Sequence, residues 1–144
     1  MIIDNLQLTG ALQISLNNEI VHQCDNLVVT AGKKWVAGRF KDGSIPDEMS
    51  HMAIGSADTA AAAGNTALAT ELNRIALTTD GGTVSTNTVQ YDASWTSAAA
   101  AYAIKEAGIF NAATGGTMLA RTTFAVINKG TDDTVSISWT ITVS

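Results

Sequence analysis

The clearest pattern of apolar and polar positions runs from Thr134 to Ser144. Every even position is Ser or Thr, and every odd position is apolar: Val135, Ile137, Trp139, Ile141 and Val143. A period of two is typical of a β-strand with one face buried and the other in water. Thr, Val and Ile also fit a pleated sheet well. The pattern predicts a strand over 135–143 whose odd-numbered face lies in the core.

Two further strand-like runs precede this one. Ile104 to Phe110 is separated from Met118 to Ile127 by the turn residues Gly115-Gly116. The chain therefore contains three successive strands in this region, and we expect the rest of the chain to supply the layer that covers them.

The N-terminal part shows the same alternation around a polar dipeptide. An apolar phase alternates on both sides of Asn17-Asn18, with Leu12, Ile14 and Leu16 before it and Ile20 and Cys24 after it, and His22 falls on the same phase. Asn tolerates positive φ, so this dipeptide predicts a tight β-hairpin. The preceding residues, 1–10, include the apolar side chains of Ile2, Ile3, Leu6 and Leu8, and we interpret them as a docking segment that lies on another surface.

One segment has helical spacing. Trp35, Val36 and Phe40 fall near helical spacing, and we expect the two aromatic side chains in the core. Thr30 is a suitable N-cap and Gly43 a suitable stop. The sequence predicts a helix over 31–41. A second, brief helix is expected through Leu68 and Leu72 to Asn73, capped by Asn65 or Thr66. Further strands are expected over 51–55, 74–79 and 84–95, with an Ala-rich surface loop over 56–65.

These elements amount to about eight strands and one or two short helices. The count favours a single domain over 1–144, mainly β, with the antiparallel β-sandwich architecture of the jelly-roll or immunoglobulin-like class. A parallel α/β sheet would need more helices.

Composition narrows the functional classes. The chain has 144 residues, of which 46% are hydrophobic and 15% charged, so it can bury a real core. The net charge of -5 and the lack of a basic stripe argue against a nucleic-acid partner. No apolar run approaches the roughly 20 residues of a membrane span. Asp4 stands where a signal peptide needs positive charge, so we expect synthesis in the cytoplasm without secretion.

Few residues suggest chemistry. A small metal site could combine His22, Cys24 and His51 with an acid such as Asp25. The alternative is a structural histidine beside a buried free thiol, which we favour because such pairs often arise by chance. A nucleophilic cysteine activated by His51 lacks an orienting third group. We therefore expect no catalytic residues, metal, cofactor or small-molecule ligand, and no enzymatic activity.

Two charges stand inside apolar strands. Glu106 lies between Ile104 and Ile109, and Arg121 lies between Leu119 and Phe124. A buried charge is costly unless it is paired. One hypothesis is that Glu106 meets Arg121 or Arg74, or accepts backbone amides, and so fixes the strand register. The alternative is that both charges point to solvent.

Three segments together resemble the tail-collar fibre proteins of tailed bacteriophages. Met52-Ala53-Ile54-Gly55 is followed by Thr66-Ala67-Leu68, and then by Glu71-Leu72-Asn73-Arg74. Ile104-Lys105-Glu106-Ala107-Gly108-Ile109-Phe110-Asn111 is similar to a second motif of that family, and a turn and the strand Met118-Leu119-Ala120-Arg121 follow. Lys129 falls near a downstream lysine of the family. The resemblance covers about residues 50–129.

The resemblance implies a virion structural protein that acts by assembly. It implies self-association, with a trimer favoured, and contacts with other virion proteins in a tail fibre or baseplate. A capsid decoration (cement) protein is the alternative, and a carbohydrate-binding module would rest only on stray aromatic residues such as Trp95 or Tyr102. The candidate residues for structural or assembly roles are Glu106, Arg121, Arg74, Gly108, Phe110 and Trp139.

Overall fold

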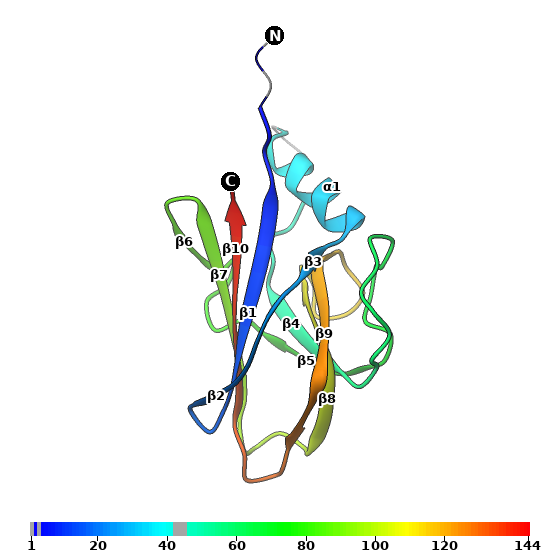
Figure 1. The fold of residues 1–144 in the computed structure, drawn as a ribbon, viewed down its shortest axis with the longest axis vertical. Coiled ribbons are helices and arrows are strands. Elements are labelled where there is room, and N and C mark those ends of the chain that lie inside the picture. Colours follow the sequence, from blue (N-terminus) through cyan, green and yellow to red (C-terminus); the bar gives the residue numbers. More distant parts are fainter. Residues whose placement is uncertain (1, 3, 42–45) are drawn as a thin grey trace.

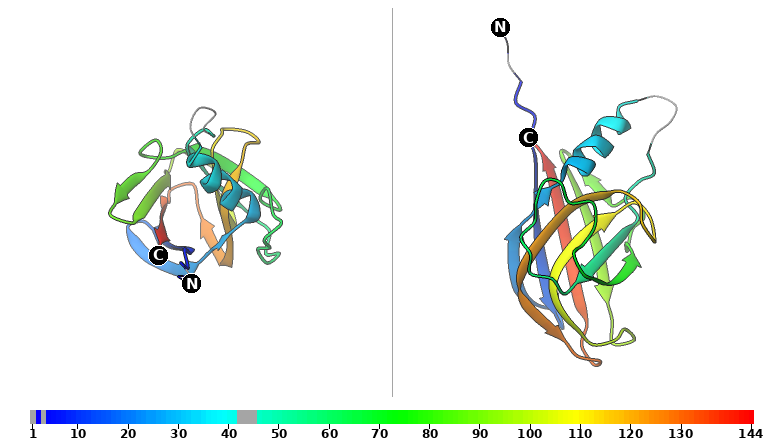
Figure 2. Two further views of the ribbon diagram at one scale, coloured as in Figure 1. Left: turned by 90° about the horizontal axis from the view of Figure 1, so that it is seen from above. Right: turned by 90° about the vertical axis from the view of Figure 1, so that its right-hand side faces the viewer.

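The protein is mainly β. A computed structural model describes residues 2, 4–41 and 46–144, and in it two five-stranded antiparallel sheets pack as a sandwich beside one short helix (Figures 1 and 2). The first sheet has the order β2 (Glu19–Asp25), β1 (Leu8–Leu16), β10 (Val135–Val143), β7 (Thr88–Trp95) and β6 (Thr83–Ser85). The second has the order β3 (Leu27–Val28), β9 (Met118–Lys129), β8 (Tyr102–Phe110), β4 (His51–Gly55) and β5 (Glu71–Ala76). The predicted β-sandwich is confirmed.

The last three strands do not form one layer, which corrects the expectation from sequence. β8 and β9 pair with each other in the second sheet, whereas β10 lies in the first sheet between β1 and β7. The chain changes sheet in the turn after β9, where the Gly130 amide donates to the Asp133 side chain and the Asp133 amide donates to the Gly130 carbonyl. Alternation identifies the buried face of a strand, but it does not determine which of the two sheets the strand joins.

The alternation in β10 has the predicted sense. Four of its odd-numbered side chains are buried between the sheets: Val135, Ile137, Trp139 and Ile141. Val143 is 38% exposed, so the core ends one residue pair earlier than predicted. The core between the sheets also holds Trp95, which is 1% exposed and not on the surface as one interpretation supposed.

The predicted hairpin at Asn17-Asn18 is present. Both residues have positive φ, 52° and 67°, as a tight two-residue turn requires. A bulge then shifts the register, because Ile14 pairs with His22 while Ser15 pairs with Ile20. The alternation expected in β2 is therefore broken, and Ile20 is 51% exposed.

The helix α1 spans Thr30–Arg39, close to the predicted 31–41. Its N-cap is Val29 and not the predicted Thr30, and the cap makes no side-chain hydrogen bond. The Val29 amide donates instead to the Leu119 carbonyl, so contact with β9 fixes where the helix begins. Phe40, expected to pack in the core, is 80% exposed, and the predicted stop at Gly43 lies outside the described residues.

The second predicted helix is absent from the described chain. Residues 66–70 are irregular and β5 begins at Glu71, earlier than the strand predicted from Arg74. The strand predicted over 84–95 is a hairpin of β6 and β7, with Thr86 at a φ of 54° in the turn. No described helix is long and apolar enough to span a bilayer.

Two apolar clusters hold the fold together. The larger lies between the sheets, and a smaller one lies on the outer face of the second sheet, formed by Val29, Ala53, Leu68, Phe110 and Met118. The segment from Ser56 to Thr70, which contributes Leu68 to this cluster, therefore packs against the outer face of the second sheet. Residues 8–10, assigned by sequence to a docking segment, belong to β1, and Ile2 and Asp4 to Gln7 precede the sheet.

We predict that the two faces of β10 differ strongly in their tolerance to truncation. Ile137→Ala should lower the free energy of unfolding by about 2–4 kcal/mol, because it leaves a cavity between the sheets. The matched change Ser138→Ala, on the outer face, should stay within about 0.5 kcal/mol. Urea denaturation measures both, and equal losses would contradict the assignment of the faces.

We also predict an acid-dependent link between two turns. Asn17 Nδ2 donates to Asp133 Oδ1 at 2.9 Å. This bond, followed by the one from the Gly130 amide, lowers the pKa of Asp133 below its ordinary value of 3.8. Because the folded-state pKa is the lower one, ionised Asp133 stabilises the fold above about pH 3.8. That contribution is lost as the pH falls through the folded-state pKa.

Asn17→Gly, which tolerates the positive φ, should therefore raise the pKa of Asp133 toward 3.8. An NMR titration of the Asp133 carboxyl carbon measures the change. Asn18→Gly is the matched control, because the Asn18 side chain makes no hydrogen bond within the described part of the chain. An unchanged Asp133 titration in Asn17→Gly would rule out the link.

Candidate functional site: a buried ion pair beneath a surface loop

Glu106 and Arg121 form an ion pair on the outer face of the second sheet. They project from the adjacent strands β8 and β9, and their side chains are 0% and 1% exposed. Arg121 donates from Nε and Nη2 to Glu106 Oε2 at 3.0 and 2.8 Å. The predicted contact of Glu106 with an arginine is confirmed, and its partner is Arg121. The alternative that both charges face solvent is wrong.

Backbone amides complete the coordination of the Glu106 carboxylate. Thr70 N donates to Oε1 at 2.7 Å, Ala69 N to Oε2 at 3.0 Å and Ala57 N to Oε1 at 3.3 Å. Both parts of the hypothesis for Glu106, an arginine and backbone amides, therefore hold at once. Such saturation is what a buried carboxylate needs to offset its lost hydration.

The remaining donors of Arg121 reach the same loop. Nη1 donates to Asn65 Oδ1 at 3.0 Å, and Nη2 donates to the Thr59 carbonyl at 2.9 Å. Asn65 Oδ1 also accepts the Ala62 amide. Asn65 is thus part of a polar network and does not cap a helix. Together the two charges hold the segment Ser56–Thr70, which we call the anchored loop, at both ends and in its middle.

Two glycines let the anchored loop lie close to the sheet. A Cβ on Gly55 would collide with Glu106 Oε1 and the Thr70 carbonyl, and one on Gly108 would lie 2.9 Å from Leu68 Cδ2. A larger residue at either position would push the loop away from the ion pair. Gly108, a candidate from sequence, therefore serves packing beside the ion pair.

Arg74 and Phe110 form a second contact on this face. The Arg74 guanidinium lies 3.6 Å from the centroid of the Phe110 ring. It also forms a bidentate pair with Glu71 and donates to the carbonyls of Ala112 and Gly115. Arg74 thereby ties β5 to the turn between β8 and β9. The hypothesis that Arg74 pairs with Glu106 is wrong, because Arg74 pairs with Glu71 and Glu106 pairs with Arg121.

Trp139 lies apart from this cluster. Its ring is buried between the sheets, and its Nε1 donates to Asn26 Oδ1 at 2.6 Å. Asn26 stands where the chain passes from β2 to β3 and so from one sheet to the other. The position of Trp139 fits a core residue that fixes this crossing.

Lys129 has a larger structural role than the sequence indicated. Its side chain is 2% exposed, and Nζ donates to the carbonyls of Ala99, Ala100 and Gly130 at 3.5, 3.3 and 3.0 Å. It closes the end of the sandwich by holding the link between β7 and β8. The signal was present in the sequence, because Lys129 continues the buried phase of Ile127.

The candidate metal residues do not form a site. No group of three or more His, Cys, Asp or Glu gathers in metal-binding geometry within residues 2, 4–41 and 46–144. His22 lies against Phe124, with ring centroids 5.6 Å apart, and His51 Nδ1 lies 2.8 Å from Ser50 Oγ. Burial raises the pKa of the Cys24 thiol, which disfavours a reactive thiolate.

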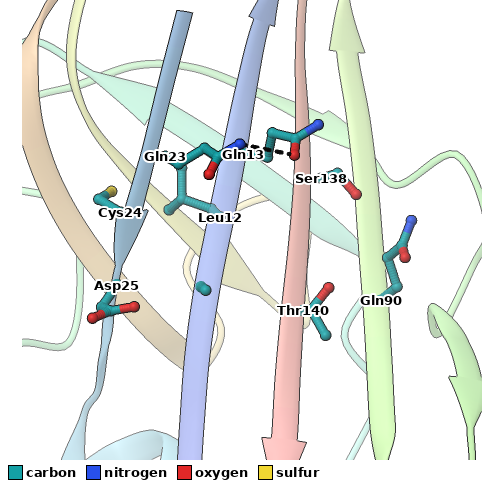
Figure 3. A pocket seen from close by; sticks show the side chains of 9 residues that line it. Leu12, Gln13, Gln23, Cys24, Asp25, Gln90, Ser138 and Thr140 are labelled. Atoms are coloured by element: carbon teal, nitrogen blue, oxygen red, sulfur yellow. Dashed lines mark hydrogen bonds between the residues drawn. The ribbon is translucent and has the colours of Figure 1, made fainter. Parts of the chain in front are cut away.

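The outer face of the first sheet is open and polar. A hollow of about 560 Å³ lies across β2, β1, β10 and β7. Figure 3 shows Gln13, Gln23 and Gln90 around the shorter Ser138 and Thr140. Gln23 Nε2 donates to Gln13 Oε1 at 3.4 Å. Neither an aromatic nor a basic side chain lines this hollow. It offers no stacking surface for a sugar, so it does not favour the carbohydrate-binding alternative.

The protein is thus a β-sandwich in which the buried Glu106–Arg121 ion pair holds the anchored loop on the outer face of the second sheet. Comparison of the chain with protein-family models, curated proteins and solved structures finds no match.

We predict that Glu106→Gln removes the anchor. The substitution leaves the Arg121 charge buried without its counter-ion, which should lower the free energy of unfolding by about 3–5 kcal/mol. The amides of Ala57, Ala69 and Thr70 should lose hydrogen-exchange protection. Denaturant unfolding and amide exchange measure the two effects.

Asp58→Asn is the matched control on the same loop. Asp58 is 81% exposed and lies 3.8 Å from Lys105, so its loss should change stability by less than about 1 kcal/mol. Adding Arg121→Met to Glu106→Gln should recover part of the loss, because the unpaired charge is removed. A Glu106→Gln protein with unchanged stability and exchange would refute the anchoring role.

Proposed function

We propose that this chain is a bacteriophage virion structural protein that acts by oligomeric assembly, most directly as a module of a tail fibre or baseplate. The observation that carries the proposal is the convergence of the motif residues. Leu68, Arg74, Glu106, Gly108 and Phe110 are separated in sequence but meet on one face of the second sheet. The ordered motifs that resemble the tail-collar family therefore describe one structural unit.

The structure suits a protein that binds its partners through a surface that is already ordered. The anchored loop is ordered by its own chain before any partner arrives, so little conformational entropy remains to be lost on docking. Its surface consists mainly of small side chains, with Lys105 and Asp58 as an exposed pair. Such a surface packs against a neighbour without a large cost for desolvating charges.

The partners that we propose are further copies of the chain, as a trimer by the resemblance, and other virion proteins. Capsid decoration is the alternative location for the same assembly chemistry. The present observations favour the tail because the motif unit belongs to that resemblance. In neither case does the proposal require a cofactor, nucleic acid or membrane.

Labelling of virions tests the proposal. Phage particles carrying this protein should bind gold-labelled antibody at the tail in negative-stain images, and the protein should remain with virions through a density gradient. Label spread over the head would instead support the decoration alternative. A protein absent from purified particles would refute both.

A further inference from the structure

Large apolar side chains are exposed together at one end of the sandwich. Leu6 is 67% exposed, Phe40 80% and Val143 38%. All three line one groove of about 610 Å³, which Leu8 and Val36 extend. Its lining residues come from α1, the start of β1 and the end of β10 and from the chain next to them. These three elements lie together at one end of the sandwich (Figure 1). Contiguous exposed apolar surface of this kind usually marks a place of contact with another molecule.

The same end carries an unusual concentration of positive charge. Four of the eight basic residues of the chain lie between positions 33 and 41: Lys33, Lys34, Arg39 and Lys41. α1 itself contains no acidic residue. Lys33 and Arg39 both line the groove. In a protein with a net charge of -5, this basic lining favours a partner segment that combines apolar side chains with a carboxylate.

The N-terminal segment of the chain has that composition. Ile2, Asp4 and Leu6 alternate with other residues, so in an extended strand all three side chains point to one side. Ile2 is 93% exposed, so the groove of its own chain does not hold it. The amides of Gln7 and Ser144 donate to each other's carbonyls at 2.8 and 2.9 Å and continue the ladder of β1 with β10. Leu6 still lines the groove beside α1, and the chain before it runs away from the body (Figure 2).

We propose that the N-terminal segment before Leu6 in one copy docks in the groove of a second copy. Ile2 would cover Val36 and Phe40 of the second copy and Asp4 would face its Lys33 and Arg39, while Leu6 continues to line the groove of its own chain. We call this N-terminal segment the arm. Two copies exchange their arms, or each of three copies in a ring places its arm in the groove of the next, and the contact between arm and groove is the same in both arrangements. The inference rests on the proposed function and names the surface through which self-assembly occurs.

Sedimentation velocity of single-residue variants tests the contact. Phe40→Ser and Leu6→Ser should each raise the dissociation constant of the oligomer about tenfold or more, because each removes a large apolar side chain from the interface. Both side chains are mostly exposed in the single chain, so the fold should be unchanged. Val84→Ser, at a 73% exposed apolar residue on β6, is the matched control and should not change association. Equal effects of all three would overturn the proposal.

A charge exchange tests the polar part of the contact. Asp4→Lys should weaken association, and adding Lys33→Asp should restore part of it. Weakening that the second substitution does not relieve would contradict the pairing of these two residues.

Disulfide cross-linking tests whether the contact forms between two copies or within one chain. In a Cys24→Ser background, Asp4→Cys combined with Lys33→Cys should give covalent dimers or trimers under mild oxidation. A disulfide confined to single chains, or none, would overturn the proposal.

The two proposals fail separately. A wild-type protein that stays monomeric at hundreds of micromolar overturns the arm contact, whereas the virion location is judged by labelling. An oligomer that forms through other residues, such as the exposed Ile20 and Val126, overturns only the arm contact.

Discussion

The ion pair between Glu106 and Arg121 is the constraint on which the outer face of the second sheet depends. Placing two full charges under a loop is unfavourable unless every oxygen and most donors find partners, and here five hydrogen bonds reach the carboxylate. The arrangement leaves the loop little freedom, because moving it would expose or orphan the charges. The hydrogen bonds of the pair therefore fix where the loop lies on the sheet.

The sequence was sufficient where a local rule decides the outcome. Alternation in β10 gave the buried face, Asn17-Asn18 gave the first hairpin, and two charges inside apolar strands gave the ion pair. It was insufficient where distant contacts decide. Thr66-Ala67-Leu68 looks helical by itself, but the amides of Ala69 and Thr70 are held by Glu106, so no helix forms there.

The same reasoning explains the errors at α1. Phe40 has the spacing of a core residue, but the helix contacts β9 through its first turn, so Phe40 remains in solvent. Helical periodicity identifies a face without saying whether the fold supplies anything to cover it. Exposed apolar residues and basic residues lie together at the end of the sandwich that carries α1. Their combination indicates a contact surface for a segment that is both apolar and acidic, which neither feature indicates by itself.

The place of β10 has a consequence for how the protein reaches this structure. β10 separates β1 from β7, so more than a hundred residues lie between β1 and the second of the two strands that pair with it. During synthesis β1 and β7 emerge first and present unpaired edges until β10 leaves the ribosome. Contacts of such long range make folding slow and leave a nascent chain open to wrong pairing. The outward-facing side chains of β10 are Ser and Thr, which remain hydrated in the folded sheet. β10 can therefore insert between β1 and β7 late in folding, because only its inner face has to leave water.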